Sequence, residues 1–414
     1  MNLKDKTIIL GVTGGISAYK AIELTRLLVK AGADVWPVMT EAAREFIGPL
    51  SLATLSGNPV SSSLFKENPK NKITHIELAE RADLVIVAPA TANTIGKLAG
   101  GIADDILTTL VLATEAPLLV APAMNHRMYE NKAVQANIEK LKGFGNFSFV
   151  GPEVGELACG SEGPGRLAPV ELIFSAAERL LSDKDLTGET VLVTAGATRE
   201  TIDPVRFFSN GSSGKMGFAV ARSAHARGAK VLLISGATEL DIPDGVEFTQ
   251  VISAEDMHRE AMSAYKESTI VIMVAAVSDY RPIENHTKKI KKGSGNLTIE
   301  MERTRDILKE MGDKKEDRVL VGFALETDNI VENAKEKLEK KNLDMIVANS
   351  TEALASGVNQ ATISFRDRAD ETLPTLEKRE VAELILDRAL ELKSGNSKKD
   401  SVKVAAPLPF NKVR

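Results

Sequence analysis

The sequence predicts a chain of two α/β domains, each built on a largely parallel β-sheet. Short runs rich in β-branched residues recur, as in TIIL at 7–10 and LVIVA at 84–88. Stretches with helical periodicity separate most of these runs, which is the alternation of a parallel sheet covered by helices on both faces. The alternation starts afresh after a polar segment at 182–189. Two domains are therefore expected.

The first domain is expected over residues 1–181. Its predicted strands are continuous apolar runs at 7–10, 84–88 and 118–121. Between the first two, Ala18, Leu24 and Leu28 share one apolar helix face, and Gly32 is a natural residue to end that helix. A last helix is predicted over about 169–181.

The second domain is expected over residues 190–392, with 182–189 as the linker. Strand, glycine-rich turn and helix begin again with VLVTAGATRE. The predicted strands are 191–194, 231–235, 270–275, 319–324 and 345–348. Residues 393–414 are polar and contain two prolines, and we expect a disordered tail there.

Composition is that of a soluble globular protein, with 43% hydrophobic and 26% charged residues. The net charge of -5 argues against binding to nucleic acid or to an anionic membrane. The single cysteine, Cys159, excludes an intrachain disulfide and fits a reducing, cytoplasmic setting. The N-terminal apolar run breaks at Gly14-Gly15 and does not resemble a secretion signal, and no apolar stretch reaches the ~18 residues of a membrane span.

Glycine-rich and polar segments follow the predicted strands of the first domain, where open parallel sheets bind ligands. Residues 11–17, GVTGGIS, join a strand to a helix, so the backbone could approach a phosphate closely. The glycine spacing is not that of the dinucleotide-binding motif G-x-G-x-x-G. Two interpretations of this loop remain, a site for a single phosphate and a plain tight turn. Residues 88–109, APATANTIGKLAGGIADDILTT, supply small residues and hydroxyls after a buried strand, and taken alone they indicate a close contact between helix and sheet.

Two further segments of this domain suggest chemistry. PAMNHRMY, 122–129, leaves a strand and enters a helix with an Asn, a His and two Met. Residues 151–169 are rich in Gly and Pro and hold Cys159, which predicts an irregular lid. A thiol with a pKa of about 8.5 is mostly protonated at pH 7 and can donate a proton. The alternatives are a buried cysteine and structural histidines at His75, just before a predicted helix, and His126.

The second domain carries its own charged segments. AGATRETIDPVRFFSNGSSGKMG, 195–217, places Lys215 at a helix start that suits an anion, although Walker A spacing is absent. Asp279 ends a buried strand, and HTKKIKKGSG, 286–295, is either a ligand-binding or a solvated basic loop. Lys337 and Lys341 lie four apart on one predicted helix face. Separate lysines with one aspartate suit a triphosphate and Mg²⁺.

On these segments the first domain resembles the flavin-dependent cysteine decarboxylases, specifically the phosphopantothenoylcysteine decarboxylases. The family motif P-x-M-N-x-x-M-W is matched at 122–129, with Tyr129 in place of Trp. The motif A-C-G-D-x-G-x-G-R is matched at 158–166, with Ser161 in place of Asp. The resemblance implies a flavodoxin-like, Rossmann-like fold and FMN.

The resemblance also implies roles for residues of the first domain. Asn125 would hold the substrate carboxylate and Met124 would pack beside it, His75 would assist thiol oxidation, and Cys159 would supply the final proton. The expected FMN-binding residues are Gly14, Gly15, Ser17, Thr40, Ala88 and Thr91.

The second domain resembles the phosphopantothenate–cysteine ligases, on the block 195–217 followed in order by AAVSDYRP, KIKK, GFALET and KKNLDMIVAN. This resemblance implies a second Rossmann-like domain with a parallel-rich sheet. The substrate residues would be Arg206, Ala275 and Ala276, with Asn210 and Lys289 catalytic. The residues expected to bind CTP are Asp279, Lys289, Asp306, Ile307, Phe323, Lys337 and Lys341, with Asp279 also on Mg²⁺. Arg305 stands where the family commonly has Pro, close to the expected nucleotide.

Together the two resemblances imply a bifunctional enzyme of coenzyme A synthesis. The ligase half would activate 4′-phosphopantothenate with CTP to an acyl-cytidylate and couple it to cysteine. The FMN half would oxidatively decarboxylate the product and reduce the enethiol to 4′-phosphopantetheine. They also imply a homo-oligomer, a dodecamer of trimeric flavoprotein halves and dimeric ligase halves.

Two rival functions are weighed against this one. A regulatory flavoprotein that inhibits phosphatases is disfavoured by Cys159 and the intact ligase segments. An NAD(P)-linked reductase is disfavoured because G-x-G-x-x-G is missing.

Overall fold

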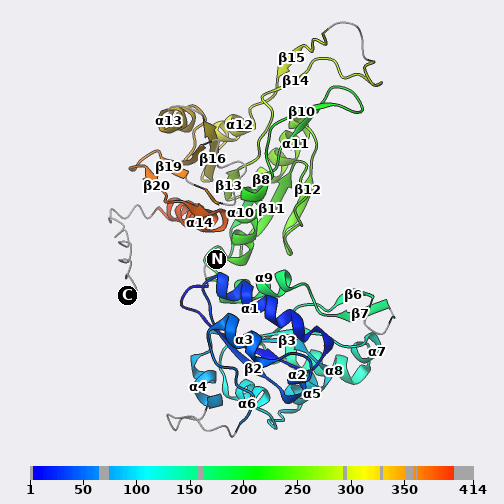
Figure 1. Cartoon of the computed structure of the whole chain (residues 1–414). Coiled ribbons are helices and arrows are strands. Elements are labelled where there is room, and N and C mark those ends of the chain that lie inside the picture. Colours follow the sequence, from blue (N-terminus) through cyan, green and yellow to red (C-terminus); the bar gives the residue numbers. More distant parts are fainter. Residues whose placement is uncertain are drawn as a thin grey trace, which may run out of the picture. The chain divides into compact units, whose positions relative to one another are not determined.

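The computed structural model describes residues 3–64, 74–156, 160, 162–291, 296–326, 330–350, 358–359 and 361–395. The chain forms two compact units, Met1–Asp185 and Leu186–Arg414 (Figure 1). Most of the predicted tail, 396–414, lies outside the described residues. None of the described helices is both long and apolar enough to cross a membrane.

The first unit is built on a five-stranded, entirely parallel sheet, as predicted. The strand order is β2-β1-β3-β4-β5, which is the flavodoxin-like order. The strands are β1 Thr7–Val12, β2 Asp34–Met39, β3 Leu84–Ala90, β4 Leu118–Pro122 and β5 Phe147–Phe149. The helices are η1 Ile16–Tyr19, α1 Lys20–Lys30, α2 Glu41–Arg44, α3 Pro49–Ser56, α4 Thr74–Arg81, α5 Ala92–Gly100, α6 Ile106–Ala113, α7 His126–Tyr129, α8 Lys132–Lys142 and α9 Val170–Leu181.

Both faces of this sheet are buried, which explains why its strands are continuously apolar. Ile8 and Leu10 of β1 pack into a core that α1 and α9 complete on one face. Ile9, between them, packs into the core on the other face with residues of α5, α6 and α8. Gly32 adopts a φ of 90° just past α1 and ends that helix as predicted.

The predicted irregular lid is instead largely a hairpin. Strands β6 Glu153–Glu156 and β7 Glu162–Arg166 pair antiparallel. At Gly165 the backbone lies so close to the turn after β4 that a Cβ would come within 2.2 Å of the carbonyl oxygen of Met124. Glycine at this position therefore allows the hairpin to pack on that turn. Cys159 and Ser161 lie outside the described residues.

The second unit contains an eight-stranded sheet that is mostly parallel, as predicted. Its order is β12-β11-β8-β13-β16-β17-β19-β20, and among these strands β19 alone runs against the others, pairing antiparallel with β17 and with β20. The strands are β8 Thr190–Ala195, β11 Lys230–Ser235, β12 Glu247–Gln250, β13 Ile270–Met273, β16 Val319–Glu326, β17 Met345–Ser350, β19 Ala361–Phe365 and β20 Glu371–Thr372.

Helices cover both faces of this sheet as well. Val191 and Val193 of β8 face the core that contains residues of α10 Lys215–Ala226 and α14 Lys378–Lys393. Leu192 faces the opposite core with residues of α11 Ala254–Tyr265, α12 Ile307–Asp313 and α13 Ile330–Lys340.

Short antiparallel ribbons complete the second unit. They pair β9 Arg199–Thr201 with β10 Phe207–Ser209, β14 Tyr280–Pro282 with β15 Met301–Arg303, and β18 Val358–Asn359 with β21 Leu376–Glu377. β14 and β15 extend away from the large sheet (Figure 1).

Two local predictions are corrected. The helix predicted to continue through Lys341 ends at Lys340, but the Lys341 N–H still donates to the Lys337 carbonyl at 3.0 Å. His75, predicted just before a helix, is the second residue of α4.

Candidate active sites of the two units

A cavity of about 850 Å³ lies where the carboxyl ends of β1, β3 and β4 meet in the first unit. This edge of a doubly wound sheet is where ligands bind. The cavity gathers seven of the residues predicted from sequence: Gly14, Gly15, Ser17, Thr40, Thr91, Met124 and Asn125.

Threonines fix the loops around this cavity. The Thr13 hydroxyl donates to the carbonyl of Pro89 at 2.7 Å and accepts from the Thr91 N–H at 3.2 Å, which joins the loops after β1 and β3. Thr91 in turn caps α5, and Thr40 caps α2. The loop after β1 also passes close to α2, because a Cβ on Gly14 would lie 2.5 Å from that of Ala42.

The turn after β4 is organised by Asn125. Its side-chain oxygen accepts from the N–H of Arg127 at 2.9 Å and caps α7. The N–H of Met124 donates to the carbonyl of Gly165 in the β6–β7 hairpin at 2.9 Å. Strand, cap and hairpin together hold Met124 and Asn125 at the cavity.

Two predicted residues of the first unit do not line the cavity, and a third lies outside the described residues. Ala88 is buried in β3, and it is not among the described residues that line the cavity. His75 on α4 is also missing from that lining, and its buried Nδ1 lacks a hydrogen-bond partner among the described residues. Cys159 lies outside the described residues.

Sequence analysis missed a charged cluster that lines the same cavity. The Lys97 ammonium lies 2.8 Å from a carboxylate oxygen of Asp104 and 3.4 Å from one of Asp105. The hydrogen bond to Asp104 raises the pKa of Lys97 in spite of its partial burial. The sequence KLAGGIADD matches no recognised motif. Its charged residues come together only through the sharp turn at Gly101, which has a φ of 67°.

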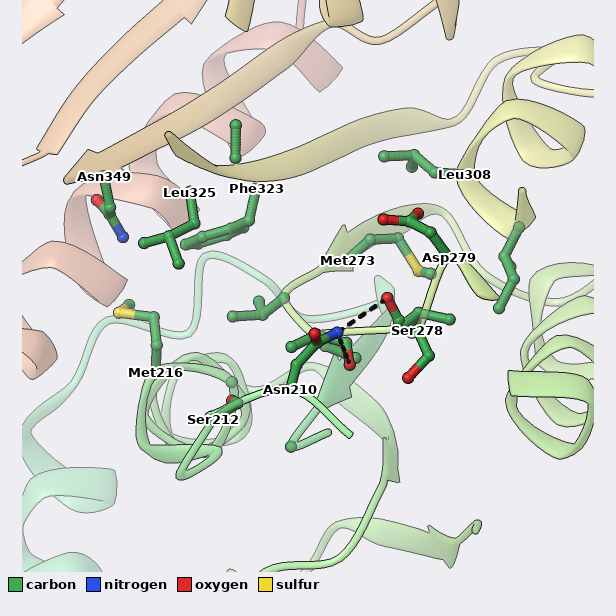
Figure 2. A pocket seen from close by; sticks show the side chains of 18 of the residues that line it. Asn210, Ser212, Met216, Met273, Ser278, Asp279, Leu308, Phe323, Leu325 and Asn349 are labelled. Atoms are coloured by element: carbon green, nitrogen blue, oxygen red, sulfur yellow. Dashed lines mark hydrogen bonds between the residues drawn. The ribbon is translucent and has the colours of Figure 1, made fainter. Parts of the chain in front are cut away.

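A second cavity, of about 520 Å³, lies at the carboxyl ends of β13, β16 and β17 in the second unit. Figure 2 shows side chains from several elements around it. Nine predicted residues line it: Asn210, Ala275, Ala276, Asp279, Asp306, Ile307, Phe323, Lys337 and Lys341.

Hydrogen bonds between side chains and the backbone shape the centre of this cavity. The Asn210 amide nitrogen lies 3.4 Å from the carbonyl oxygen of Ala276 and 3.3 Å from that of Val277, as Figure 2 shows. The next residue, Ser278, donates its N–H to the Thr198 hydroxyl at 3.0 Å, and its carbonyl accepts from the Thr304 hydroxyl at 2.6 Å. The loop after β13 is thereby fixed on both sides.

Opposite charges meet at one end of the second cavity. Asp306 caps α12 and lies 2.9 Å from the ammonium of Lys341. The Asp279 carboxylate is exposed and has no hydrogen bond or ion pair within the described part of the chain. The described residues contain no group of three or more His, Cys, Asp or Glu that could hold a metal. A divalent cation here would need the phosphate oxygens of a bound molecule as further ligands beside Asp279.

Two predicted residues of the second unit lie outside this cavity. Lys289 is exposed in the loop beyond β14. Arg206, between β9 and β10, lies 3.5 Å from Asp203 and contacts the carbonyl of Ile290 at 3.4 Å.

The lining of the second cavity includes Asn349 and Lys378, which sequence analysis did not single out. Burial, and secondarily the nearby Lys215, lowers the pKa of Lys378.

Comparison with known proteins defines the class. Residues 1–182 match the flavoprotein family, and residues 186–392 match the C-terminal domain family of DNA/pantothenate metabolism flavoproteins. The chain is thus a two-domain flavoprotein of pantothenate metabolism.

Full-length relatives narrow this class. The coenzyme A biosynthesis bifunctional protein CoaBC of Bacillus subtilis (strain 168) is 48% identical over 398 residues, or 94% of this chain and 98% of the relative. The CoaBC protein of Escherichia coli (strain K12) is 44% identical over 395 residues, which cover 94% of this chain and 97% of the relative. The chain belongs to this family of bifunctional coenzyme A biosynthesis enzymes, with a decarboxylase half and a ligase half.

Solved structures resemble each half. The C-terminal domain of a coenzyme A biosynthesis bifunctional protein CoaBC is 42% identical, with a TM-score of 0.46, over 52% of this chain and all of that one. A mutant PPC decarboxylase complexed with pantothenoylaminoethenethiol is 31% identical, with a TM-score of 0.38, over 42% of this chain and 96% of that one.

Proposed function

We propose that the second unit uses CTP and Mg²⁺ to couple 4′-phosphopantothenate to cysteine. The first unit then decarboxylates the product to 4′-phosphopantetheine with FMN as its flavin. The observation that carries this proposal is that each unit gathers its own predicted motif around one cavity at the carboxyl edge of its sheet.

The first cavity fits a flavin mononucleotide. Its volume of about 850 Å³ is within the range of cofactor sites, and its edge carries the glycine turn and the threonine-capped helices. Gly14, Gly15, Ser17, Thr40 and Thr91 would hold FMN, whereas Ala88, predicted for the same role, is buried in β3 and is not among the described residues that line this cavity. Bound FMN would supply a hydride acceptor and donor for the carbon and sulfur chemistry of the substrate.

The protein residues would position and protonate the substrate. The turn at Asn125 would bind the carboxylate that leaves as CO₂, with Met124 packed beside it. The Cys159 thiol would deliver the final proton to carbon. His75 would serve as the base, and since it does not line this cavity among the described residues, a second copy of the chain would have to present it.

The ligase step needs charge compensation on a triphosphate. Lys337 and Lys341 would bind phosphate oxygens at the cavity, and Asp279 would hold Mg²⁺. Asp306, Ile307 and Phe323 would hold the rest of the nucleotide. These groups would stabilise the charge that develops when the carboxylate attacks the α-phosphate and pyrophosphate leaves.

The remaining ligase residues would position the acid substrate, three of them from the cavity and two from outside it. Ala275, Ala276 and Asn210 would position the activated acyl group for attack by the cysteine amine. Arg206 and Lys289 lie outside the cavity, so their proposed roles require movement of these loops or another copy of the chain.

We propose a cytoplasmic homo-oligomer, a dodecamer of trimeric first units and dimeric second units, with small-molecule substrates and with neither nucleic acid nor membrane as partner. Large apolar side chains remain exposed on the ribbon segments of the second unit, which supports a contact there. They include Val205, Phe207, Phe208 and Ile283, whose exposed fractions range from 44% to 59%.

The test measures both half-reactions in one protein. Purified protein is given 4′-phosphopantothenate, cysteine, Mg²⁺ and either CTP or ATP, and pyrophosphate and CO₂ are followed with flavin absorbance as a check. We expect CTP-dependent pyrophosphate and CO₂, and Cys159→Ala should lose 4′-phosphopantetheine formation while it keeps pyrophosphate release. Pyrophosphate without CO₂ would remove the decarboxylase assignment, and the absence of both would overturn the proposal.

A further inference from the structure

Three charged residues line the flavin cavity and have no part in the proposed chemistry. They are Lys97 on α5 and Asp104 and Asp105 in the segment before α6, and we call them the Lys97 cluster. The Lys97 ammonium lies 2.8 Å from a carboxylate oxygen of Asp104 and 3.4 Å from one of Asp105. One cation thus faces two anions, and the cluster carries a net charge of one negative unit.

The local fold keeps the charges of this cluster together. Gly101 ends α5, and the turn that follows places the start of α6 opposite Lys97. Asp105 caps α6, because its Oδ1 accepts from the N–H of Thr108 at 2.8 Å. A cation in the last turn of one helix and an anion at the start of the next are both favoured by the helix dipoles. The hydrogen bond from Asp104 also raises the pKa of Lys97, so its ammonium stays charged at neutral pH.

The other charges at this cavity balance one another. Four further charged residues line it, two of each sign, so among the described lining residues the net charge is that of the Lys97 cluster. These four residues are Lys20, which is half-buried, and the exposed Glu41, Glu156 and Arg166. Within the cluster, the side chains of Lys97 and Asp105 are only 21% and 25% exposed. Water therefore screens these two charges less than it screens the exposed ones.

The size of the cavity places the cluster near a bound flavin. The cavity of about 850 Å³ is no larger than a cofactor and its substrate need, so its lining lies within ~8 Å, one Debye length, of a molecule that fills it. A flavin reduced by two electrons loses its N1 proton near neutral pH and becomes an anion. Fixed charges nearby therefore change the balance between oxidised and reduced flavin. This step rests on the proposed use of FMN.

We propose that the Lys97 cluster sets the redox balance of the bound flavin. The ammonium of Lys97 stabilises the reduced anion, and the carboxylates of Asp104 and Asp105 oppose this effect. The proposed decarboxylation takes a hydride from the substrate and later returns it, so a flavin held too firmly in either state would slow one of the two steps. The cluster forms no bond with the substrate and acts only through its electric field at the flavin.

The test measures the midpoint potential of the flavin in the full-length holoenzyme at neutral pH, by reductive titration against a reference dye. Lys97→Met removes the cation and should lower the potential, whereas Asp104→Asn removes an anion and should raise it. Each shift should correspond to about a three- to tenfold change in the ratio of reduced to oxidised flavin, where tenfold equals about 30 mV for a two-electron couple. Lys97→Arg should keep the wild-type potential. Asp105 is left unchanged because it caps α6.

Helix α8 supplies a matched pair of control variants. Lys142 lies 2.8 Å from Glu139, the same distance as between Lys97 and Asp104, and neither residue of this pair is among the described residues that line the cavity. Lys142→Met and Glu139→Gln should therefore leave the potential of the flavin unchanged.

Opposite shifts distinguish an effect of charge from an effect on structure, because a loosened cavity would change both cluster variants alike. Flavin content and melting temperature are measured for every variant, and if Lys97→Met loses its flavin, the potential of Asp104→Asn alone decides. Shifts of the same sign, shifts no larger than those of the control pair, or loss of flavin from both cluster variants would overturn the role of the cluster. A wild-type protein that neither contains flavin nor binds added FMN would instead overturn the proposed flavin function.

Discussion

At the scale of single residues, a glycine in the flavin cavity can be required because a side chain would not fit there, and not only because of its backbone conformation. A Cβ on Gly14 would lie 2.5 Å from Ala42 Cβ and 2.8 Å from its carbonyl carbon. Because α2 follows directly from its cap at Thr40, the added methyl must displace the loop after β1. Gly14 therefore determines where that loop can present its N–H groups.

Gly14→Ala should reduce bound flavin strongly. We expect at least a tenfold loss of flavin affinity, because a loop shift of this size is costly in a packed site. The measurement is flavin absorbance per protein after purification, with ligase activity as an internal check of folding. Gly48→Ala is the matched control, since no atom lies within 4 Å of its new methyl. Full flavin content in Gly14→Ala would contradict the proposed cradle.

Residue types and motifs predicted much of the two cavity linings, but not all of it. Asn125 lies in the loop after β4, which ends at Pro122, and Asp279 in the loop after β13, which ends at Met273, so parallel-sheet geometry puts both loops at the ligand-binding edge. Lys378 was missed because its own segment reads as an ordinary polar helix start. It reaches the cavity only through the packing of α14 beside α10, which no local pattern encodes.

At the scale of elements, α12 is held in place by a carboxylate with two partners. Glu310 lies 2.8 Å from the ammonium of Lys314 and 2.7 Å from Nε2 of His258 on α11. Lys314 first, and then His258, lower the pKa of Glu310 from 4.5 to about 2. Since Asp306 in the ligase cavity caps the N-terminus of α12, this contact helps to position a cavity residue.

Glu310→Gln should destabilise the second unit in a pH-dependent way. A depressed pKa in the folded state stabilises above the unfolded value of 4.5, and this contribution is lost as pH falls toward about 2. The melting temperature should therefore fall by roughly 1–3 °C above pH 5, with the difference shrinking toward pH 2. Calorimetry across this range checks it, with exposed Glu339→Gln as control. A pH-independent difference would show that the ion pair is not its cause.

Element types were easier to predict than element edges or pairings. The β-branched run at 345–348 marked β17, but its antiparallel neighbour β19 comes from a short segment with weaker periodicity. The lid was predicted as irregular because its glycines suggest loops. Those glycines instead permit the β6–β7 hairpin to approach Met124.

At the scale of the whole molecule, each unit contains its own hydrophobic core on both faces of its own sheet. The cores of the first unit draw on residues from Leu3 to Leu181, and those of the second on residues from Leu186 onward. Such self-contained cores are the property that lets a domain fold alone. The predicted boundaries at 181 and 190 remain predictions, and Leu186 between them is fully buried in the second core.

Dividing the chain into two fragments should preserve both half-reactions, provided that Leu186 stays in the second fragment. Fragments 1–185 and 186–414 should each keep their own activity within about threefold, since no core is divided. Fragment 190–414 lacks Leu186, whose N–H also donates to the Arg227 carbonyl at 3.1 Å. It should be less stable than 186–414 by about 2–5 kcal/mol, the cost of removing a buried leucine. Denaturant unfolding of the two ligase fragments measures the difference directly. Equal stability would place the boundary at 190, whereas inactivity of 186–414 would show that ligase function depends on the first unit.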